Sequence, residues 1–319
     1  MRPLLFLDVA LFLGVAALVA GCQTDPSSVP TIDGQAYHFV TAWGVSGDGP
    51  AQLREPTGVA ISGDTVFVSD AGNNRVQVFN RSGGFLYTIG GDSLHRPMHL
   101  ETHAGRLYVP SYLTDRILIY SSSGGYLDGV GRSGAAPGTF DAPAAVAVMR
   151  EGRLAVVDFY NHRVQIIRPD GRADLILGTG TAGSEPGQFS YPTDVAVLPN
   201  GGLVVADAYN HRIQAFDPSG VLRWVVPDDS AEASTDAGRF NVATAIAIGP
   251  DERVFVADFF NHRIQIFSGE GDFLSEFGTH GSGEGQFDRP ADIALDPEGR
   301  LFVVDFGNDR IQVFEPAEN

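Results

Sequence analysis

Asp258-Phe-Phe-Asn-His-Arg-Ile-Gln-Ile-Phe267 is the stretch of sequence that decides the fold. It predicts the end of one strand, a tight polar turn and the start of the next strand. The pattern occurs six times in the 319 residues, 41 to 51 residues apart, and its copies begin at Asp70, Ser111, Asp158, Asp207, Asp258 and Asp305. Self-similarity at such a period indicates a repeat architecture, which sets the expected fold.

Each repeat contains four short segments that are typical of β-strands. In the fifth repeat these segments are 244–248, 254–257, 263–267 and 273–277. Short strands that are separated by turn signals about every 8 to 12 residues, without helical periodicity, indicate an all-β protein. Four strands in a period of about 40 to 50 residues predict one propeller blade. The six repeats therefore predict a six-bladed β-propeller of four-stranded blades.

The last repeat lacks its fourth strand, because the chain ends at Phe314-Glu-Pro-Ala-Glu-Asn319. The missing strand is predicted at the other end of the chain, where Tyr37-His-Phe-Val-Thr-Ala-Trp-Gly44 resembles 273–278 in character. An N-terminal strand that completes the last blade would close the ring and remove a free sheet edge. We therefore expect residues 36–319 to form one closed propeller domain.

The first 35 residues are predicted to direct export and to anchor the protein. Val9–Ala20 is an apolar run of the length of a signal-peptide core, shorter than the roughly 20 residues of a transmembrane helix. Leu18-Val-Ala-Gly-Cys22 resembles the bacterial lipobox, which implies a signal peptide over 1–21 and lipidation of Cys22, the only cysteine. The alternative is an ordinary secretory signal with a chance cysteine. The polar residues 22–35 are predicted to be a tether.

The expected location is the cell envelope. Several acyl chains, such as lipoprotein processing attaches, anchor a protein stably to a membrane, whereas one chain is marginal. Gln23, not Asp, follows Cys22, and by resemblance to enterobacterial sorting this implies the periplasmic face of the outer membrane.

The composition argues against a nucleic acid partner. Asp and Glu number 39 against 21 Lys and Arg, so the net charge is −18. A phosphate backbone is recognised by basic surfaces, which this chain lacks overall. The single cysteine also excludes an internal disulfide.

The repeated turn resembles the NHL repeat, which is named for Asn-His-Leu. Asn-His-Arg stands at 161–163, 210–212 and 261–263. The other copies depart from it, with Asn73-Asn-Arg75, Thr114-Asp-Arg116 and Asn308-Asp-Arg310. The resemblance covers 36–315 and implies a six-bladed β-propeller. The family includes RNA-binding, protein-binding, sensory and enzymatic members, so the fold alone does not give the function.

Most repeated polar residues are predicted to be structural. The Asp at the head of each turn and the Arg five residues later recur in register, and we expect them to pair or to hold turn amides. His162, His211 and His262 share one position of the turn. That position is too far from the axis for them to meet on a metal.

A second set of polar residues is predicted near the central channel, where the innermost strand of each blade begins. The residues at this position are Gly58, His99, Ala145, Asp194, Ala245 and Asp292. His99, Asp194 and Asp292 form a metal-like ligand set, so a divalent metal at the channel mouth is one interpretation. The other interpretation is that each Asp stands there because Asp is favoured in the turn at the start of the strand, and that His99 only fills space. NHL-type peptide-amidating lyases, which the fold resembles, use three histidines on this ring, and only His99 matches.

Aromatic residues follow the turn Asp on the same face of the ring. They are Tyr112, Phe159, Tyr160, Tyr209, Phe259, Phe260 and Phe306. They either pack between adjacent blades or form a ligand-binding rim, because aromatic side chains dominate interface energetics.

The sequence thus predicts a lipid-anchored, extracytoplasmic NHL propeller that binds an envelope protein, peptide or glycan. It predicts no catalytic constellation and requires no cofactor. The alternative is a metal-dependent lyase or hydrolase that acts at the channel mouth. RNA binding, known among NHL relatives, conflicts with the charge and with export.

Overall fold

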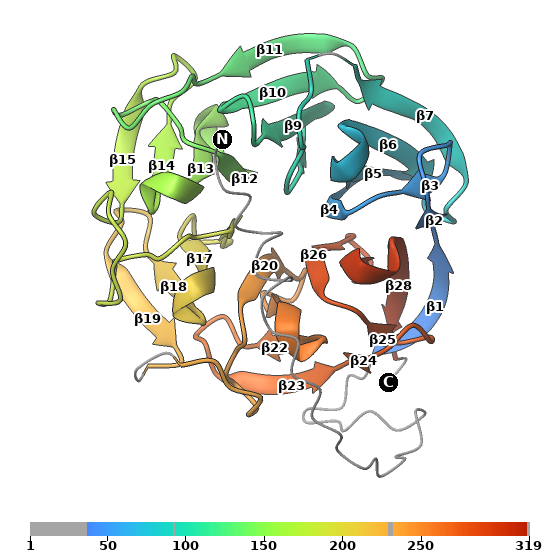
Figure 1. The fold of residues 1–319 in the computed structure, drawn as a ribbon. Helices are drawn as coiled ribbons and strands as arrows, with labels where there is room; N and C mark the ends of the chain where they lie inside the picture. The colour runs from blue at the N-terminus through green and yellow to red at the C-terminus, as the bar shows by residue number, and fades with distance from the viewer. Residues whose placement is uncertain (1–36, 92, 229–231, 318–319) are drawn as a thin grey trace, which may run out of the picture.

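The computed structural model describes residues 37–91, 93–228 and 232–317. These residues form six four-stranded sheets around a central axis (Figure 1). The regular elements among them are strands and short 3-10 helices, and no helix in the described ranges is long and apolar enough to cross a membrane. The predicted all-β, six-bladed propeller is confirmed. The signal peptide, Cys22 and the tether lie outside the described residues.

The first three blades each run from an inner strand outward in chain order. Blade 1 consists of β4 (Pro56–Ser62), β5 (Thr65–Asp70), β6 (Arg75–Asn80) and β7 (Phe85–Gly90). Blade 2 consists of β8 (Glu101–His103), β9 (Arg106–Ser111), β10 (Arg116–Ser121) and β11 (Tyr126–Val130). Blade 3 consists of β12 (Pro143–Val148), β13 (Leu154–Asp158), β14 (Arg163–Ile167) and β15 (Ala173–Leu177).

The remaining blades repeat this order, except that the outer strand of blade 6 comes from the N-terminal end. Blade 4 consists of β16 (Asp194–Val197), β17 (Leu203–Asp207), β18 (Arg212–Phe216) and β19 (Leu222–Val226). Blade 5 consists of β20 (Ala243–Ile248), β21 (Val254–Asp258), β22 (Arg263–Phe267) and β23 (Phe273–Phe277). Blade 6 consists of β26 (Pro290–Leu295), β27 (Leu301–Asp305), β28 (Arg310–Pro316) and β1 (Tyr37–Trp43).

The ring closes as predicted, with β1 antiparallel to β28 from Tyr37↔Pro316 to Trp43↔Ile311. Figure 1 shows β1 beside β28 on the outer edge of the ring. Tyr37 fixes this closure, since its ring stacks on Phe277 at a centroid distance of 5.8 Å and its hydroxyl donates to the Gly299 carbonyl at 3.1 Å.

The two faces of the ring differ in their loops. In every blade except blade 2, a single-turn 3-10 helix follows the second strand; these are η1 (Ala71–Asn73), η3 (Phe159–Asn161), η4 (Ala208–Asn210), η5 (Phe259–Asn261) and η6 (Phe306–Asn308). The inner strands begin at the same end, as the pairing Pro143↔Asp158 shows. We call this end the upper face and the opposite end the lower face.

Hydrophobic residues at the entry to each blade fill the spaces between blades. They are Leu53, Leu94, Phe140, Phe189, Phe240 and Phe287, and each is fully buried. Phe140, for example, packs in one cluster with Ile117 of blade 2 and Val156 of blade 3. Burying such a side chain contributes about 1.5–3 kcal/mol, so these six residues hold neighbouring blades together.

The turn Asp forms the centre of a buried network in five blades. In blade 5, Asp258 has no exposed surface and accepts hydrogen bonds from Arg263 Nε (2.8 Å), Asn261 Nδ2 (2.8 Å) and Gln265 Nε2 (3.0 Å). Its other oxygen accepts the Asn241 backbone N–H at 2.8 Å. The structure therefore confirms the Asp–Arg pairing and adds Gln265, which the sequence analysis missed although it recurs seven residues after Asp.

The residue directly before the recurring Arg links each blade to the next one. His162, His211 and His262 accept, through Nδ1, a backbone N–H of the following blade's entry segment, each at 3.1 Å. In the other three blades a side-chain oxygen of Asn74, Asp115 or Asp309 accepts the equivalent N–H at 2.8–2.9 Å. The structural interpretation of the three histidines is confirmed.

Arg263→Ala should destabilise the protein by roughly 1–3 kcal/mol, because it leaves the buried Asp258 carboxylate with one partner fewer. Chemical denaturation measures this loss. Arg116→Ala is the matched control, since Arg116 holds the same register in blade 2 where Ser111 replaces Asp. Equal losses of stability in both variants would contradict the network's importance.

Candidate functional site

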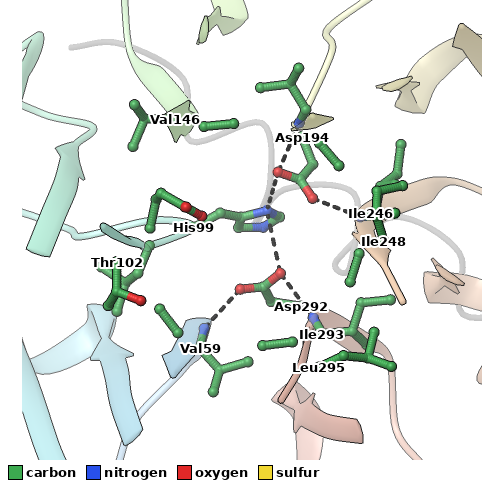
Figure 2. Close-up of a pocket in the computed structure, with 18 of the residues that line it drawn as sticks. Val59, His99, Thr102, Val146, Asp194, Ile246, Ile248, Asp292, Ile293 and Leu295 are labelled. Atoms are coloured by element: carbon green, nitrogen blue, oxygen red, sulfur yellow. Dashed lines mark hydrogen bonds and ion pairs between the residues drawn. The ribbon is translucent and has the colours of Figure 1, made fainter. Parts of the chain in front are cut away.

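His99, Asp194 and Asp292 meet at the axis of the ring (Figure 2). The distance from His99 Nδ1 is 3.5 Å to Asp194 Oδ1 and 3.8 Å to Asp292 Oδ1. One candidate ligand atom from each of the three residues lies within 4.8 Å of the others, and all three residues are buried. The structure therefore brings together the three polar residues that the sequence analysis placed near the channel.

Backbone N–H groups hold both carboxylates in place. Asp194 accepts from the Val195 N–H at 2.8 Å and from the Ile246 N–H of blade 5 at 2.6 Å. Asp292 similarly accepts from the Ile293 N–H at 2.8 Å and from the Val59 N–H of blade 1 at 2.7 Å. Each carboxylate thus ties the inner strand of its own blade to that of the next blade.

His99 reaches the axis because the chain before β8 is drawn inward. The His99 N–H donates to the Ala144 carbonyl of blade 3 at 3.1 Å, and the Ser69 hydroxyl holds the Met98 carbonyl at 2.6 Å. A Cβ at Gly58 would lie 2.4 Å from that carbonyl oxygen. Gly58 therefore permits the close approach that places His99.

Burial and mutual electrostatic interactions shift the pKa values of the ionisable residues at the axis. Burial by itself would lower the pKa of His99, but the carboxylates of Asp292 and Asp194 raise it to about 9. Burial raises the pKa of Asp292 to about 7, although His99 opposes the shift. Burial, followed by the repulsion of Asp194 and Asp292, raises the pKa of Glu101 to about 8. A carboxyl, two carboxylates and an imidazole thus share one poorly hydrated region.

A cavity of about 390 Å³ follows the inner strands below this group. Its upper end contains His99, Asp194 and Asp292, with Glu101 and Thr102 further along the wall. The rest of the wall is aliphatic, and its lowest residues are the partly exposed Ile61, Val148, Val197, Ile248 and Leu295. The cavity therefore extends toward the lower face.

The sequence analysis placed His99, Asp194 and Asp292 near the mouth of the channel; they lie at its upper end, and the cavity extends from them toward the lower face. Met98 and His99 separate the cavity from a much smaller crevice of about 20 Å³. Residues of the upper face, including Phe259 and Phe306, line that crevice. His99 lines both the cavity and the crevice.

The structure divides the seven predicted rim aromatics into two groups. Tyr112, Phe159 and Phe259 are at most 6% exposed and pack among neighbouring blades, so the rim prediction is wrong for them. Tyr160, Tyr209, Phe260 and Phe306 keep part of their surface exposed. In blades 3 and 5 the two adjacent positions of one turn differ, since Phe159 and Phe259 are buried whereas Tyr160 and Phe260 are partly exposed. Phe306 stands at the first position of its turn and is nevertheless partly exposed.

Tyr191 joins the partly exposed group, and the sequence analysis missed it. Its ring lies 5.0 Å from that of Tyr209 and 6.0 Å from that of Tyr160. No repeat-based signal marks Tyr191, since the equivalent residues in other blades are not aromatic. We call Tyr160, Tyr191, Tyr209, Phe260 and Phe306 the aromatic rim.

A second cluster, formed by His262, His280 and Asp288, is less suited to a metal. His262 Nδ1 already accepts the Arg289 N–H at 3.1 Å. The Arg289 guanidinium also pairs with Asp288 at 3.0 Å. A cation there would have to displace an existing positive charge.

The NHL repeat family model matches residues 53–79, 140–167, 189–216, 240–267 and 287–314. The chain is an NHL-repeat β-propeller. The five matches correspond to the blades that contain the buried Asp network. Blade 2, which carries His99 and Glu101, is outside the matches and lacks the turn Asp.

Solved structures share the architecture of this NHL propeller at low identity. A structural genomics protein of unknown function from Bacteroides thetaiotaomicron is 16% identical over 89% of this chain and 76% of that chain, with a TM-score of 0.71. Virginiamycin B lyase from Staphylococcus aureus is 15% identical over 89% of each chain, with a TM-score of 0.58. The WD40 β-propeller domain of Doa1 is 11% identical over 88% of this chain and 97% of that chain, with a TM-score of 0.61.

These likenesses show the fold alone. No curated protein sequence matches the chain. The NHL fold itself suggests a protein-interaction module, since NHL propellers commonly mediate protein binding.

Proposed function

We propose that this NHL propeller is a lipid-anchored, extracytoplasmic module that binds a protein or peptide of the cell envelope through its upper face. The observation that carries the proposal is the aromatic rim. Its five rings come from turns and entry segments of four blades and keep part of their surface exposed. Aromatic residues are enriched among the side chains that dominate protein interfaces.

Buried aromatic residues hold the rim in position. Tyr160 lies edge-on to the buried Phe159 at 5.0 Å, and Phe260 lies edge-on to the buried Phe259 at 4.9 Å. Phe306 also contacts Phe259, at 6.0 Å. Rings fixed in this way lose little conformational entropy on binding, which favours affinity.

One member of the rim, Phe306, also lines the crevice above His99, together with Met98. The rim residues are partly exposed, whereas the large hydrophobic residues with more exposure include Leu86, Tyr126, Leu127 and Val221 of the outer strands and the turns beside them, and Leu113 in the upper-face turn of blade 2. The upper face therefore offers partly exposed rings as contact surface, and the crevice of about 20 Å³ beside Phe306 adds only a shallow depression.

The proposed anchor is compatible with a free upper face. Cys22 would carry the acyl chains after removal of 1–21, and 22–35 would connect it to β1. Because β1 is the outermost strand of blade 6, the connection reaches the propeller at its circumference. The acidic net charge of −18 further favours a protein ligand over nucleic acid.

Photo-cross-linking in the native envelope tests the binding face. A photoreactive phenylalanine analogue in place of Tyr160 or Phe260 should give the same discrete protein product. The analogue at Tyr126, which is 55% exposed on the outer strand of blade 2, should not give it. Tyr160→Ala and Phe260→Ala should each weaken binding of the purified partner about 30-fold, since hot-spot truncations cost about 2 kcal/mol or more.

Tyr126→Ala is the matched control for that affinity measurement and should bind normally. Circular dichroism should show that all three alanine variants are folded. Unchanged affinity in both rim variants, or cross-linking from Tyr126 alone, would show that the upper face is not the binding surface.

Cys22→Ala should leave an unlipidated precursor, because the acyl acceptor is gone. Mass spectrometry of the membrane fraction measures the lipid and the N-terminus. The anchoring proposal is wrong if the variant still matures to a protein that begins at residue 22 and stays in the membrane.

A further inference from the structure

The most unusual buried atom of the channel is His99 Nδ1. It is inaccessible to solvent and has no hydrogen-bond partner in the described residues. The His99 residue as a whole is 6% exposed. A buried polar atom without a partner costs free energy, so it calls for an explanation such as a bound ion.

Two carboxylate oxygens face this nitrogen. Asp194 Oδ1 and Asp292 Oδ1 lie 3.5 and 3.8 Å from it, and Figure 2 shows the imidazole between them. Two ligands of a tetrahedral ion with bonds of about 2.1 Å are separated by about 3.4 Å. Shifts of a few tenths of an ångström would bring these two separations to this value, and the ligand atoms of all three residues lie within 4.8 Å of one another.

We propose that His99 Nδ1, Asp194 and Asp292 bind one divalent transition-metal ion at the upper end of the channel cavity. The charge balance supports a divalent ion. Two carboxylates and a neutral imidazole carry two negative charges, which such an ion neutralises, whereas an imidazolium would neutralise only one. Buried charges are tolerated when they are compensated in this way.

Hydrogen bonds from the surroundings hold the ligand atoms in position, as they do around metal ions in proteins. Four backbone N–H groups fix the two carboxylates, and each of the Asp194 and Asp292 Oδ1 atoms receives only one of these hydrogen bonds. A carboxylate oxygen has two lone pairs, so one on each Oδ1 remains for the ion.

The positions around the axis leave room for this site. His99, Asp194 and Asp292 come from blades 2, 4 and 6, and the intervening blades place Gly58, Ala145 and Ala245 at the equivalent positions. Blade 2 is the blade without the NHL turn residues, and only its inward segment carries an imidazole to the axis. The site thus depends on the departure of blade 2 from the repeat.

The ligand set indicates which ions should bind. Imidazole favours Zn²⁺, Fe²⁺ and other late first-row ions, whereas purely oxygen-based sites suit Mg²⁺ and Ca²⁺. Three protein ligands leave a coordination position for water or a small molecule, and the three residues line the 390 Å³ cavity. A small molecule with an oxygen donor and an apolar body would match this position and the aliphatic wall.

Cobalt titration tests the site independently of the proposed binding face. Chelator-treated full-length protein should bind one equivalent of Co²⁺ and develop visible absorption bands, and Zn²⁺ should abolish these bands and raise the melting temperature. Elemental analysis gives the stoichiometry. His99→Ala and Asp292→Asn should weaken Co²⁺ binding at least 100-fold while the circular dichroism spectrum stays unchanged.

His103→Ala and His262→Ala are the matched controls and should bind Co²⁺ like the original protein. His103 is exposed at the end of β8, and His262 belongs to the second histidine cluster. If the original protein binds no Co²⁺ or Zn²⁺, or if only His262→Ala abolishes binding, the proposal is overturned. The titration of the original protein decides this even if His99→Ala does not fold.

Discussion

The buried carboxylate of the turn between the second and third strands is the constraint on which the rest of the propeller depends. Five such aspartates have no exposed surface, and a buried charge is tolerated only when it is fully paired. In blade 5, Asp258 receives its partners from the turn, from the third strand and from the backbone of the entry segment. The turn between the strands and the loop that enters the blade therefore cannot separate without leaving the buried carboxylate unpaired.

Blade 2 lacks this constraint, and it is the blade that supplies His99 to the channel. Ser111 replaces the aspartate, and its hydroxyl interacts instead with the backbone of His95. The segment 96–99, which directly follows His95, reaches blade 3, where the His99 N–H donates to the Ala144 carbonyl. His99 thereby lies at the axis. Regular blades thus form the scaffold and a rigid aromatic rim, while the irregular blade supplies the channel with its imidazole.

The repeat made most of the fold predictable, because its information is local. The number of blades, closure by β1 and the Asp–Arg pairs follow from residues at fixed spacings. Whether each aromatic side chain is buried or exposed was not predictable. Phe159 and Tyr160, for example, are neighbours in the sequence, but their burial depends on contacts with other blades. The convergence of His99, Asp194 and Asp292 could be anticipated from strand register. Their burial could not, since it depends on the displaced segment of blade 2.

Native-state hydrogen exchange measures most directly whether the buried aspartates hold the ring together. The backbone N–H groups of Asp141, Ser190, Asn241 and Asp288 donate to these carboxylates at 2.7–2.8 Å. We predict that all four exchange only through global unfolding, like inner-strand amides, and that the His95 N–H of blade 2 exchanges through a smaller local opening. Exchange of the four amides at the free energy of ordinary loop amides would contradict the account.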